Sequence, residues 1–382
     1  MRAWFHVVLS VGMAVLASGA QAEELLLGSV RLRGGFDPNP TLLPGGKSSA
    51  FTGLDGAFAA GREQDGLKVG LVGEYERTDY LSSGLVPTDR AKLSLEAENT
   101  AFDNWNLRST TLIQRTSSAT LRSSDLSERV RVQWTGGVVR PFISGEVRFS
   151  SLNETNAILT TFLPEDLHYG RATVIPGVAI KLGDAEFGTS VNLSATRYLR
   201  SEDMFGFRRD NERIEPFLFY RYDGKGLTFA AAVSQLNGIW HDPDFSRVKQ
   251  TMYDVSLTKK LDAFTLDLAA KKFAGETSFP ISPITITTMQ SAKLSWSPRE
   301  EWTFAAFVKN FHTAYLDAPF STDLRAYGVT ASYALAKDWL IGAEIARINS
   351  IALNGEPVDG GSVTLSLTKK FNGLPAKSDK PT

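Results

Sequence analysis

The stretch Ser362-Val363-Thr364-Leu365-Ser366-Leu367-Thr368-Lys369-Lys370-Phe371 alternates small polar residues with aliphatic ones and ends on an aromatic residue. Side chains in a β-strand point to opposite faces with a period of two. The aliphatic residues and Phe371 therefore share one face, while the serines, the threonines and Lys370 share the other. One such strand would also suit a soluble sheet. Because the pattern recurs along the chain behind an export signal, it predicts strands with one face toward lipid and one toward a wet lumen.

The first 22 residues have the features of a cleaved signal peptide. Arg2 gives a positive start, residues 7–16 form an apolar core, and Ala20-Gln21-Ala22 is a small-x-small cleavage motif. The apolar core is too short for a membrane-spanning helix, which needs about 20 residues. A retained signal anchor is the alternative interpretation. We expect a mature chain that begins at residue 23.

The composition of the mature chain excludes several classes of protein. One of the 41 Lys and Arg residues lies in the signal segment, which leaves 40 against 42 Asp and Glu, a net charge of −2. This charge balance argues against a strongly basic nucleic-acid binder. The chain contains no cysteine, so disulfides, thiol chemistry and Cys-based metal sites are excluded as well. No run of 18 apolar residues follows the signal, and we expect no membrane-spanning helix.

Periodicity predicts 18 strands of 10 to 15 residues, with 16 as an alternative count. Strands of globular proteins typically run about 5–6 residues, whereas a tilted transmembrane strand needs roughly 9–11. Strand length therefore favours a membrane protein. The predicted strands lie near 25–34, 49–62, 67–80, 90–101, 105–117, 126–135, 141–152, 170–182, 185–199, 212–222, 226–239, 248–261, 264–275, 285–296, 302–315, 325–336, 339–350 and 360–371.

The connections between these strands alternate in length. Even-numbered strands end in short turns such as 63–66 and 183–184, whereas odd-numbered strands end in longer segments such as 153–169. Short periplasmic turns on one rim and long extracellular loops on the other are typical of outer-membrane barrels. We therefore predict an all-β fold, an antiparallel transmembrane β-barrel over 23–371, followed by a short polar tail, 372–382.

Charged residues gather on one face of the predicted strands. A lipid-facing Lys or Arg costs about 2–4 kcal/mol at mid-bilayer, so the charged face should meet water. Lys259 and Lys369 break the rule, but both lie near strand ends, where a long side chain can reach the interface. Pro176 removes a hydrogen-bond donor and suggests a bulge. The predicted lipid-facing sets include Leu67, Val69, Leu71 and Tyr75; Leu93, Leu95 and Ala97; Val130, Val132 and Trp134; Ile143, Val147 and Phe149; and Leu227, Phe229, Ala231 and Val233.

The charges on the polar face are the candidate pore-lining residues. Separated acidic and basic stripes would create a transverse field that orients and filters polar solutes. The alternative is that neighbouring charges pair off along the wall. The acidic stripe comprises Glu74, Glu76, Glu96 and Glu98, the basic one Arg108, Arg129 and Arg131, and beyond them lie Glu146, Arg148 and Arg221.

The segment 153–169 is rather apolar for a surface loop, with Leu159, Phe162, Leu163 and Leu167. We hypothesise that it folds inward and constricts the pore. Packing on the rim of the barrel is the alternative.

The sequence offers no convincing catalytic constellation. His168, His241 and His312 each fall in or beside a long loop, and the chain has neither a Gly-x-Ser-x-Gly elbow nor a His-Glu-x-x-His motif. The stretch 240–244 contains a His–Asp pair but no positioned serine, so we interpret it as a turn. We assign no catalytic residue, metal or cofactor. A surface enzyme or an adhesin built on the long loops remains an alternative class.

The start of the mature chain resembles a known family. Val30-Arg31-Leu32-Arg33-Gly34-Gly35-Phe36-Asp37-Pro38-Asn39-Pro40, with Gly61-Arg62 and Gly73-Glu74-Tyr75, is similar to an element of outer-membrane β-barrel porins common in α-proteobacteria. Pro38 and the tail after Phe371 depart from the family pattern. Phe371 looks like the terminal aromatic residue read by the barrel-assembly machinery. Some relatives are linked to exopolysaccharide export, so the resemblance implies a transport role without fixing the cargo.

Together these features predict a channel in the outer membrane of a Gram-negative bacterium for the passive passage of polar solutes. The rival is a conduit for a secreted polysaccharide, which needs periplasmic partners. The expected partners are outer-membrane lipid and lipopolysaccharide, the barrel-assembly machinery, and polar solutes or polysaccharide, with no nucleic acid. The sequence does not predict an oligomeric state.

Overall fold

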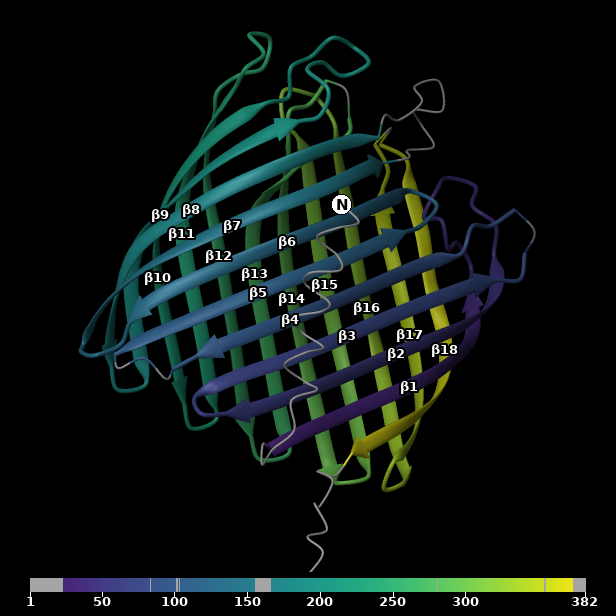
Figure 1. Ribbon diagram of the computed structural model, residues 1–382. Helices are drawn as coiled ribbons and strands as arrows, with labels where there is room; N and C mark the ends of the chain where they lie inside the picture. The colour runs from purple at the N-terminus through teal and green to yellow at the C-terminus, as the bar shows by residue number, and fades with distance from the viewer. Residues whose placement is uncertain are drawn as a thin grey trace, which may run out of the picture.

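The computed structural model describes residues 23–373 except 83, 101, 103, 155–165, 280 and 354. Every regular element within these residues is a strand (Figure 1). The strands are β1 (Glu23–Asp37), β2 (Ser49–Gln64), β3 (Leu67–Tyr80), β4 (Thr88–Asn99), β5 (Trp105–Ser117), β6 (Leu121–Trp134), β7 (Val139–Glu154), β8 (Leu167–Leu182), β9 (Ala185–Tyr198), β10 (Asn211–Gly224), β11 (Leu227–Trp240), β12 (Val248–Leu261), β13 (Phe264–Gly275), β14 (Thr285–Arg299), β15 (Trp302–Tyr315), β16 (Ser321–Ala336), β17 (Trp339–Ile351) and β18 (Pro357–Gly373).

The strands form one closed antiparallel barrel. Each strand pairs with its neighbours in the chain, and β1 also pairs with β18, from Leu26 opposite Gly373 to Phe36 opposite Val363. In Figure 1 the purple β1 runs beside the yellow β18. Closure leaves no sheet edge, so main-chain groups inside lipid can all be paired. The predicted antiparallel barrel and its count of 18 strands are confirmed, and the alternative of 16 is wrong.

Most connections follow the predicted alternation. The exception is the β5–β6 connection, which comprises only residues 118–120 because β6 begins at Leu121 and not near residue 126. The β2–β3 turn contains Asp65 and Gly66, with φ of 50° and 78°, the left-handed values that a two-residue hairpin needs. The longest connections gather at the opposite end of the barrel, which is uppermost in Figure 1. This end is the extracellular one under the interpretation of the sequence.

The bulge expected at Pro176 is absent. On β8, Val174 pairs with Leu193 and Gly177 pairs with Ser190, in one unbroken register of the β8–β9 ladder. Ile175 and Pro176 have no partner in the β8–β9 ladder, but no residue is inserted there. A missing N–H donor therefore weakens this ladder without inserting a residue into it.

A contact across the barrel identifies the inner face of the wall. Glu276, which follows β13, accepts hydrogen bonds from Arg171 of β8 and Arg213 of β10. Because β11 and β12 lie between these strands in the wall, the contacts cross the interior. Residues directly opposite each other on neighbouring strands lie on the same face of the sheet. The strand register therefore shows, strand by strand, which residues face the interior. Arg171, for example, lies opposite Arg148 of β7.

The outer face is apolar, as predicted. All the lipid-facing sets named above lie on it, and side chains such as Leu218, Ile345 and Leu365 are 59–64% exposed. An apolar surface of this extent is the surface of a barrel immersed in lipid. Lys369 also lies on this face, but its Nζ reaches to 3.4 Å from Asp338 Oδ2 in the β16–β17 turn. No helix among the described residues is long and apolar enough to cross a membrane.

Candidate functional site: the lumen wall

All ten pore-lining candidates lie on the inner face. Arg108 of β5 lies opposite Arg131 of β6 and Glu98 of β4, and the register relates the others to them. Their side chains therefore line the lumen along β3–β7 and β10.

Most of these charges are paired across neighbouring strands. Arg108 Nη2 lies 3.1 Å from Glu98 Oε2, and Arg129 forms an ion pair with Glu146. Arg148 Nη2 lies 2.6 Å from Asp125 Oδ1. Partly exposed pairs of this kind contribute at most about 1 kcal/mol of stability. The predicted stripes are thus largely neutralised, which was the alternative interpretation, and the pairs mainly make the wall polar.

Four of the ten candidates stay outside these pairs. In the described part of the chain, Glu74, Glu96, Arg131 and Arg221 have no oppositely charged side chain within 4 Å. Glu74 lies opposite Lys92 in the β3–β4 register without forming an ion pair. The free charge of the wall is therefore carried by a few residues, two acidic and two basic.

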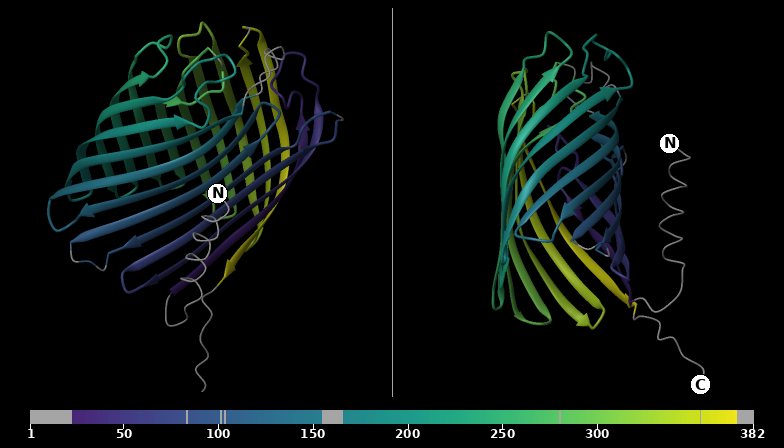
Figure 2. Two further views of the ribbon diagram at one scale, coloured as in Figure 1. Left: turned by 45° about the horizontal axis from the view of Figure 1, so that its top comes forward. Right: turned by 60° about the vertical axis from the view of Figure 1, so that its left-hand side comes forward.

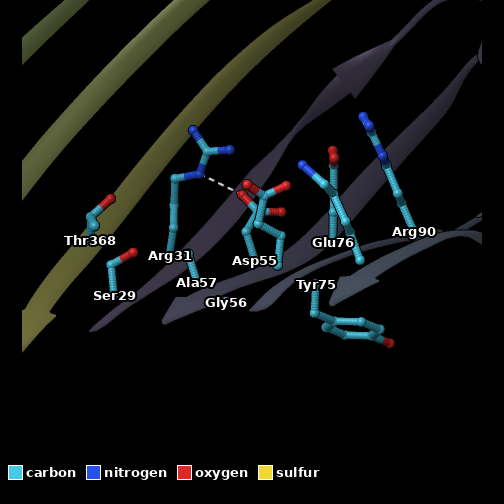
Figure 3. Close-up of a pocket in the computed structure, with 11 residues that line it drawn as sticks. Ser29, Arg31, Asp55, Gly56, Ala57, Tyr75, Glu76, Arg90 and Thr368 are labelled. Carbon is cyan, nitrogen blue, oxygen red and sulfur yellow. Dashed lines mark hydrogen bonds and ion pairs between the residues drawn. The ribbon is translucent and has the colours of Figure 1, made fainter. Parts of the chain in front are cut away.

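Sequence reasoning missed the basic residues of β1. Arg33 Nη2 lies 2.7 Å from Asp55 Oδ1 of β2 and 3.1 Å from Glu76 Oε1 of β3, and Arg31 also pairs with Asp55. Arg31, Asp55 and Glu76 border a recess of about 330 Å³. Figure 3 shows Arg31, Asp55 and Glu76 on one side of the sheet and Tyr75 on the other. Two arginines spaced two residues apart in β1 were the available signal for this cluster.

Hydroxyl groups line the lumen wall on the other side of β1, on β16 and β18. It borders a larger recess, of about 610 Å³, between β16 and β3. Small residues such as Gly342 lie among the hydroxyls, so few side chains project far into the lumen. The hydroxyl-bearing residues are Thr330, Ser332, Ser362, Thr364, Ser366 and Thr368.

The connection between β13 and β14, residues 276–284, folds into the barrel at its described residues, 276–279 and 281–284. Glu276 is anchored there by Arg171, by Arg213, and by the Tyr198 hydroxyl, which donates to Glu276 Oε2 at 2.8 Å. The side chain of Glu276 is 3% exposed. Anchors on three different strands fix the start of this inward loop against the opposite wall.

Further buried contacts hold the rest of the inward loop. The Arg209 guanidinium donates to the main-chain oxygens of Thr277, Phe279 and Ser282 at 2.7–3.1 Å. Arg209 also pairs with Asp203 at 2.8 Å, and both side chains are at most 4% exposed. Because buried charges are costly unless paired and hydrogen-bonded, this saturated network favours a single loop conformation.

The extracellular end of the β13–β14 hairpin leaves the wall. The β12–β13 ladder stops at Tyr253 opposite Lys272, although β12 begins five residues earlier. Beyond that point Lys272 donates to Gln250 of β12 at 3.1 Å. The hairpin end packs on an apolar cluster inside the barrel that comprises Leu236, Trp240, Phe245, Val248, Met252, Ile284 and Ile286.

The inward loop differs from the one hypothesised. Residues 155–165 of the segment 153–169 lie outside the described residues, so the hypothesis for them stays a prediction. The inward loop 276–284 has a weak signal in its sequence, an apolar stretch with Pro280 and Pro283. Its anchoring partners lie far away in the chain, and no local pattern identifies them.

The Glu276 carboxyl has a perturbed pKa. Burial alone would raise this pKa, but the positive charges of Arg213 and Arg171 and the hydrogen bond from Tyr198 more than offset burial. The pKa of Glu276 therefore lies below the ordinary glutamate range. The carboxylate stays charged, and the anchor stays intact, at neutral pH.

Two of the histidines in the described part of the chain each lie beside a single carboxylate. His241 Nε2 lies 3.3 Å from Glu212 Oε1, and His312 Nδ1 lies 2.8 Å from Asp323 Oδ1, all in exposed positions. Asp242 accepts the main-chain N–H of Asp244, as a turn residue does. No group of three or more His, Asp or Glu residues suited to a metal ion occurs among the residues that the structure describes.

Comparisons with known proteins give similarities of fold only. No family model and no curated protein matches the chain. Similar solved structures include OccK2 (OpdF) from Pseudomonas aeruginosa, at 10% identity and a TM-score of 0.47, covering 93% of this chain and 98% of that one. The outer membrane protein OpdK from the same organism has 10% identity and a TM-score of 0.45, with 91% and 99% covered. A mutant of its ferric enterobactin receptor PfeA has 8% identity and a TM-score of 0.46, with 92% and 81% covered.

Proposed function

We propose that this chain is a channel in the outer membrane of a Gram-negative bacterium that lets polar solutes pass by diffusion. The observation that carries the proposal is the sorting of side chains in a closed barrel, with apolar residues outward and charged or hydroxyl residues inward. An interior fills with its own side chains at about 8 strands, whereas barrels of about 16–18 strands leave an aqueous channel. A continuous polar path through the membrane is the physical consequence.

The inward loop 276–284 narrows this path at the extracellular end. Its anchors lie on β7–β10 and in the β9–β10 loop, since Glu154 of β7 accepts hydrogen bonds from the Thr277 hydroxyl and the Ser278 N–H, and Arg209 precedes β10. The loop therefore covers the part of the lumen bordered by β7–β14. The Phe279 ring also packs on Tyr315 of β15, with the ring centroids 5.0 Å apart, so the wall left uncovered is that of β16–β18 and β1–β6. We infer a channel with a fixed eccentric constriction, through which solutes pass along the charged and hydroxyl-lined side.

A conduit for polysaccharide is the second candidate, favoured by the hydroxyl-lined wall of β16–β18. Serine and threonine hydroxyls both donate and accept hydrogen bonds, as sugar hydroxyls do. Small neighbouring side chains leave such a wall flat. This function would require periplasmic partners that deliver the polymer.

Single-channel recording of the purified chain in planar bilayers tests the proposal. We expect stepwise, long-lived ion conductance without added partners. Protein that migrates as a folded, heat-modifiable barrel but gives no conductance steps would contradict passive diffusion and favour the partner-dependent conduit.

A further inference from the structure

We propose that the lumen wall near the short-turn end contains a binding subsite for organic carboxylates with a flat or C–H-rich face. Arg131 and Arg221 form its cationic part, and phenylalanine rings form its floor. The inference rests on the proposed channel function and specifies a class of solute that the channel would select.

The floor is a group of aromatic side chains on the inner face. The ring centroids of Phe142 and Phe219 lie 6.2 Å apart, and Phe217 lies 6.2 Å from Phe219. The two intervening strands carry glycine where the rings lie over them. A Cβ would come within 2.4 Å of Phe142 Cζ at Gly177, and within 2.6 Å of Phe219 Cζ at Gly188. Glycine at these two positions therefore lets the rings lie against the wall.

Two arginines stand over this floor. Arg131 Cζ lies 3.9 Å from the centroid of Phe142, and Arg221 Cζ lies 5.9 Å from that of Phe219. Arg131 is also within electrostatic range of three further arginines and of one carboxylate, namely Arg221, Arg108, Arg129 and Glu186. A guanidinium stacked on a ring gains cation–π stabilisation while its N–H groups stay available to an anion.

The two arginines differ from their neighbours in lacking an ion pair. Arg108 pairs with Glu98, whereas no carboxylate of the described residues lies within 4 Å of Arg131 or Arg221. Glu186 lies opposite Arg221 in the register, but it also lies opposite Lys181 on its other side. Neither arginine is therefore neutralised by a direct ion pair, and an added carboxylate would supply the missing partner.

The chemistry of the subsite defines its ligand. A planar guanidinium binds a carboxylate with two parallel hydrogen bonds, and an aromatic floor takes up a ring face or the C–H face of a sugar. Acetate offers the charge without the face, and benzyl alcohol offers the face without the charge. Benzoate represents a free organic acid with both features, and glucuronate represents the acidic unit of a polysaccharide.

Calorimetric titration of the full chain in detergent tests the subsite with four probes: benzoate, glucuronate, acetate and benzyl alcohol. We expect benzoate, glucuronate or both to bind about tenfold more tightly than the other two probes. Arg131→Gln and Arg221→Gln should each weaken that binding about tenfold, through the loss of a charge-assisted pair. Lys309→Gln is the matched control, because it removes a lumen cation beside Phe307 on β15 and should leave the affinity unchanged.

Three results would overturn the subsite: acetate binding as tightly as benzoate and glucuronate, undiminished binding by both arginine variants, or equal losses in the Lys309→Gln control. If the arginine variants fail to fold, Phe219→Leu tests the subsite instead. This variant removes a ring of the floor and should reduce the preference for benzoate over acetate. The preferred probe, benzoate or glucuronate, identifies the source of the ligand. Conductance separates the two proposals: binding without conductance refutes the channel, and conductance without binding refutes the subsite.

Discussion

The carboxylate of Glu128 lies on the apolar outer surface, midway along β6. Glu128 lies opposite Thr111 of β5 and Val147 of β7, and Val130 on the same face is 40% exposed. The hydroxyls of Ser109 and Thr111 both donate to its carboxylate. Two hydrogen bonds reduce the cost of placing this carboxylate toward lipid, but they do not remove it.

Replacing Glu128 by leucine should therefore stabilise the barrel in a bilayer by about 1 kcal/mol. Val130→Glu is the matched reverse change, since it places a carboxylate on the same face without hydroxyl partners, and it should destabilise by about 1–2 kcal/mol. Urea unfolding of the protein in lipid vesicles measures both. A loss of stability in Glu128→Leu would mean that the carboxylate has a partner which the barrel alone does not supply.

Glu276 is the residue on which the inward loop depends most. Glu276→Gln leaves Arg171 and Arg213 buried without a counter-charge, which costs about 3–5 kcal/mol when a buried pair is broken. We expect the loop to detach and the single-channel conductance to rise. Glu344→Gln, a lumen glutamate of β17 in the hydroxyl-lined recess, should not change the conductance. Equal conductance in both variants would contradict the anchoring role of Glu276.

The same anchor predicts a pH dependence. Because the native pKa of Glu276 is lowered, its stabilisation is present above the ordinary glutamate pKa and is lost as the pH falls through the native value. Conductance should stay constant from neutral pH down to the ordinary glutamate range and rise only below it. The Glu276→Gln channel should lack this rise, and a rise that persists in it would assign the acid response to another group.

At the scale of elements, the inward loop should decide the width of the pore. Replacing residues 277–283 by an equally long Gly-Ser linker removes the Phe279 ring, which packs on Tyr315 and Phe320, and introduces flexible glycines. The loop should then lose its fixed conformation, and conductance should increase severalfold. The same replacement of 81–87, a connection on the rim with Leu81 69% exposed, is the control and should have little effect. Deleting 155–165 tests the loop hypothesised from the sequence in the same assay.

Strands and faces were predictable because their signals are local. The alternation in 362–371 repeats every two residues, and a turn such as Asp65-Gly66 can be recognised from its residue types. The position of the inward loop was not predictable, because Glu276 meets Arg171 across more than a hundred residues of chain. Ion pairs such as Arg33 with Asp55 depend on the register between strands, which the sequence of one strand does not specify. The prediction of a bulge at Pro176 was wrong because a proline removes a hydrogen-bond donor from the ladder without inserting a residue into the strand.

At the scale of the whole molecule, the account depends on a closed wall with a dry outside and a wet inside. The absence of cysteine from the chain allows this to be tested residue by residue, since every introduced thiol is the only one present. Single cysteines placed in turn at 362–367, reconstituted in lipid vesicles, can be treated with a water-soluble maleimide that does not enter lipid. We predict labelling at Ser362, Thr364 and Ser366 and protection at Val363, Leu365 and Leu367. Uniform labelling of both faces, or labelling of the aliphatic positions alone, would contradict the account.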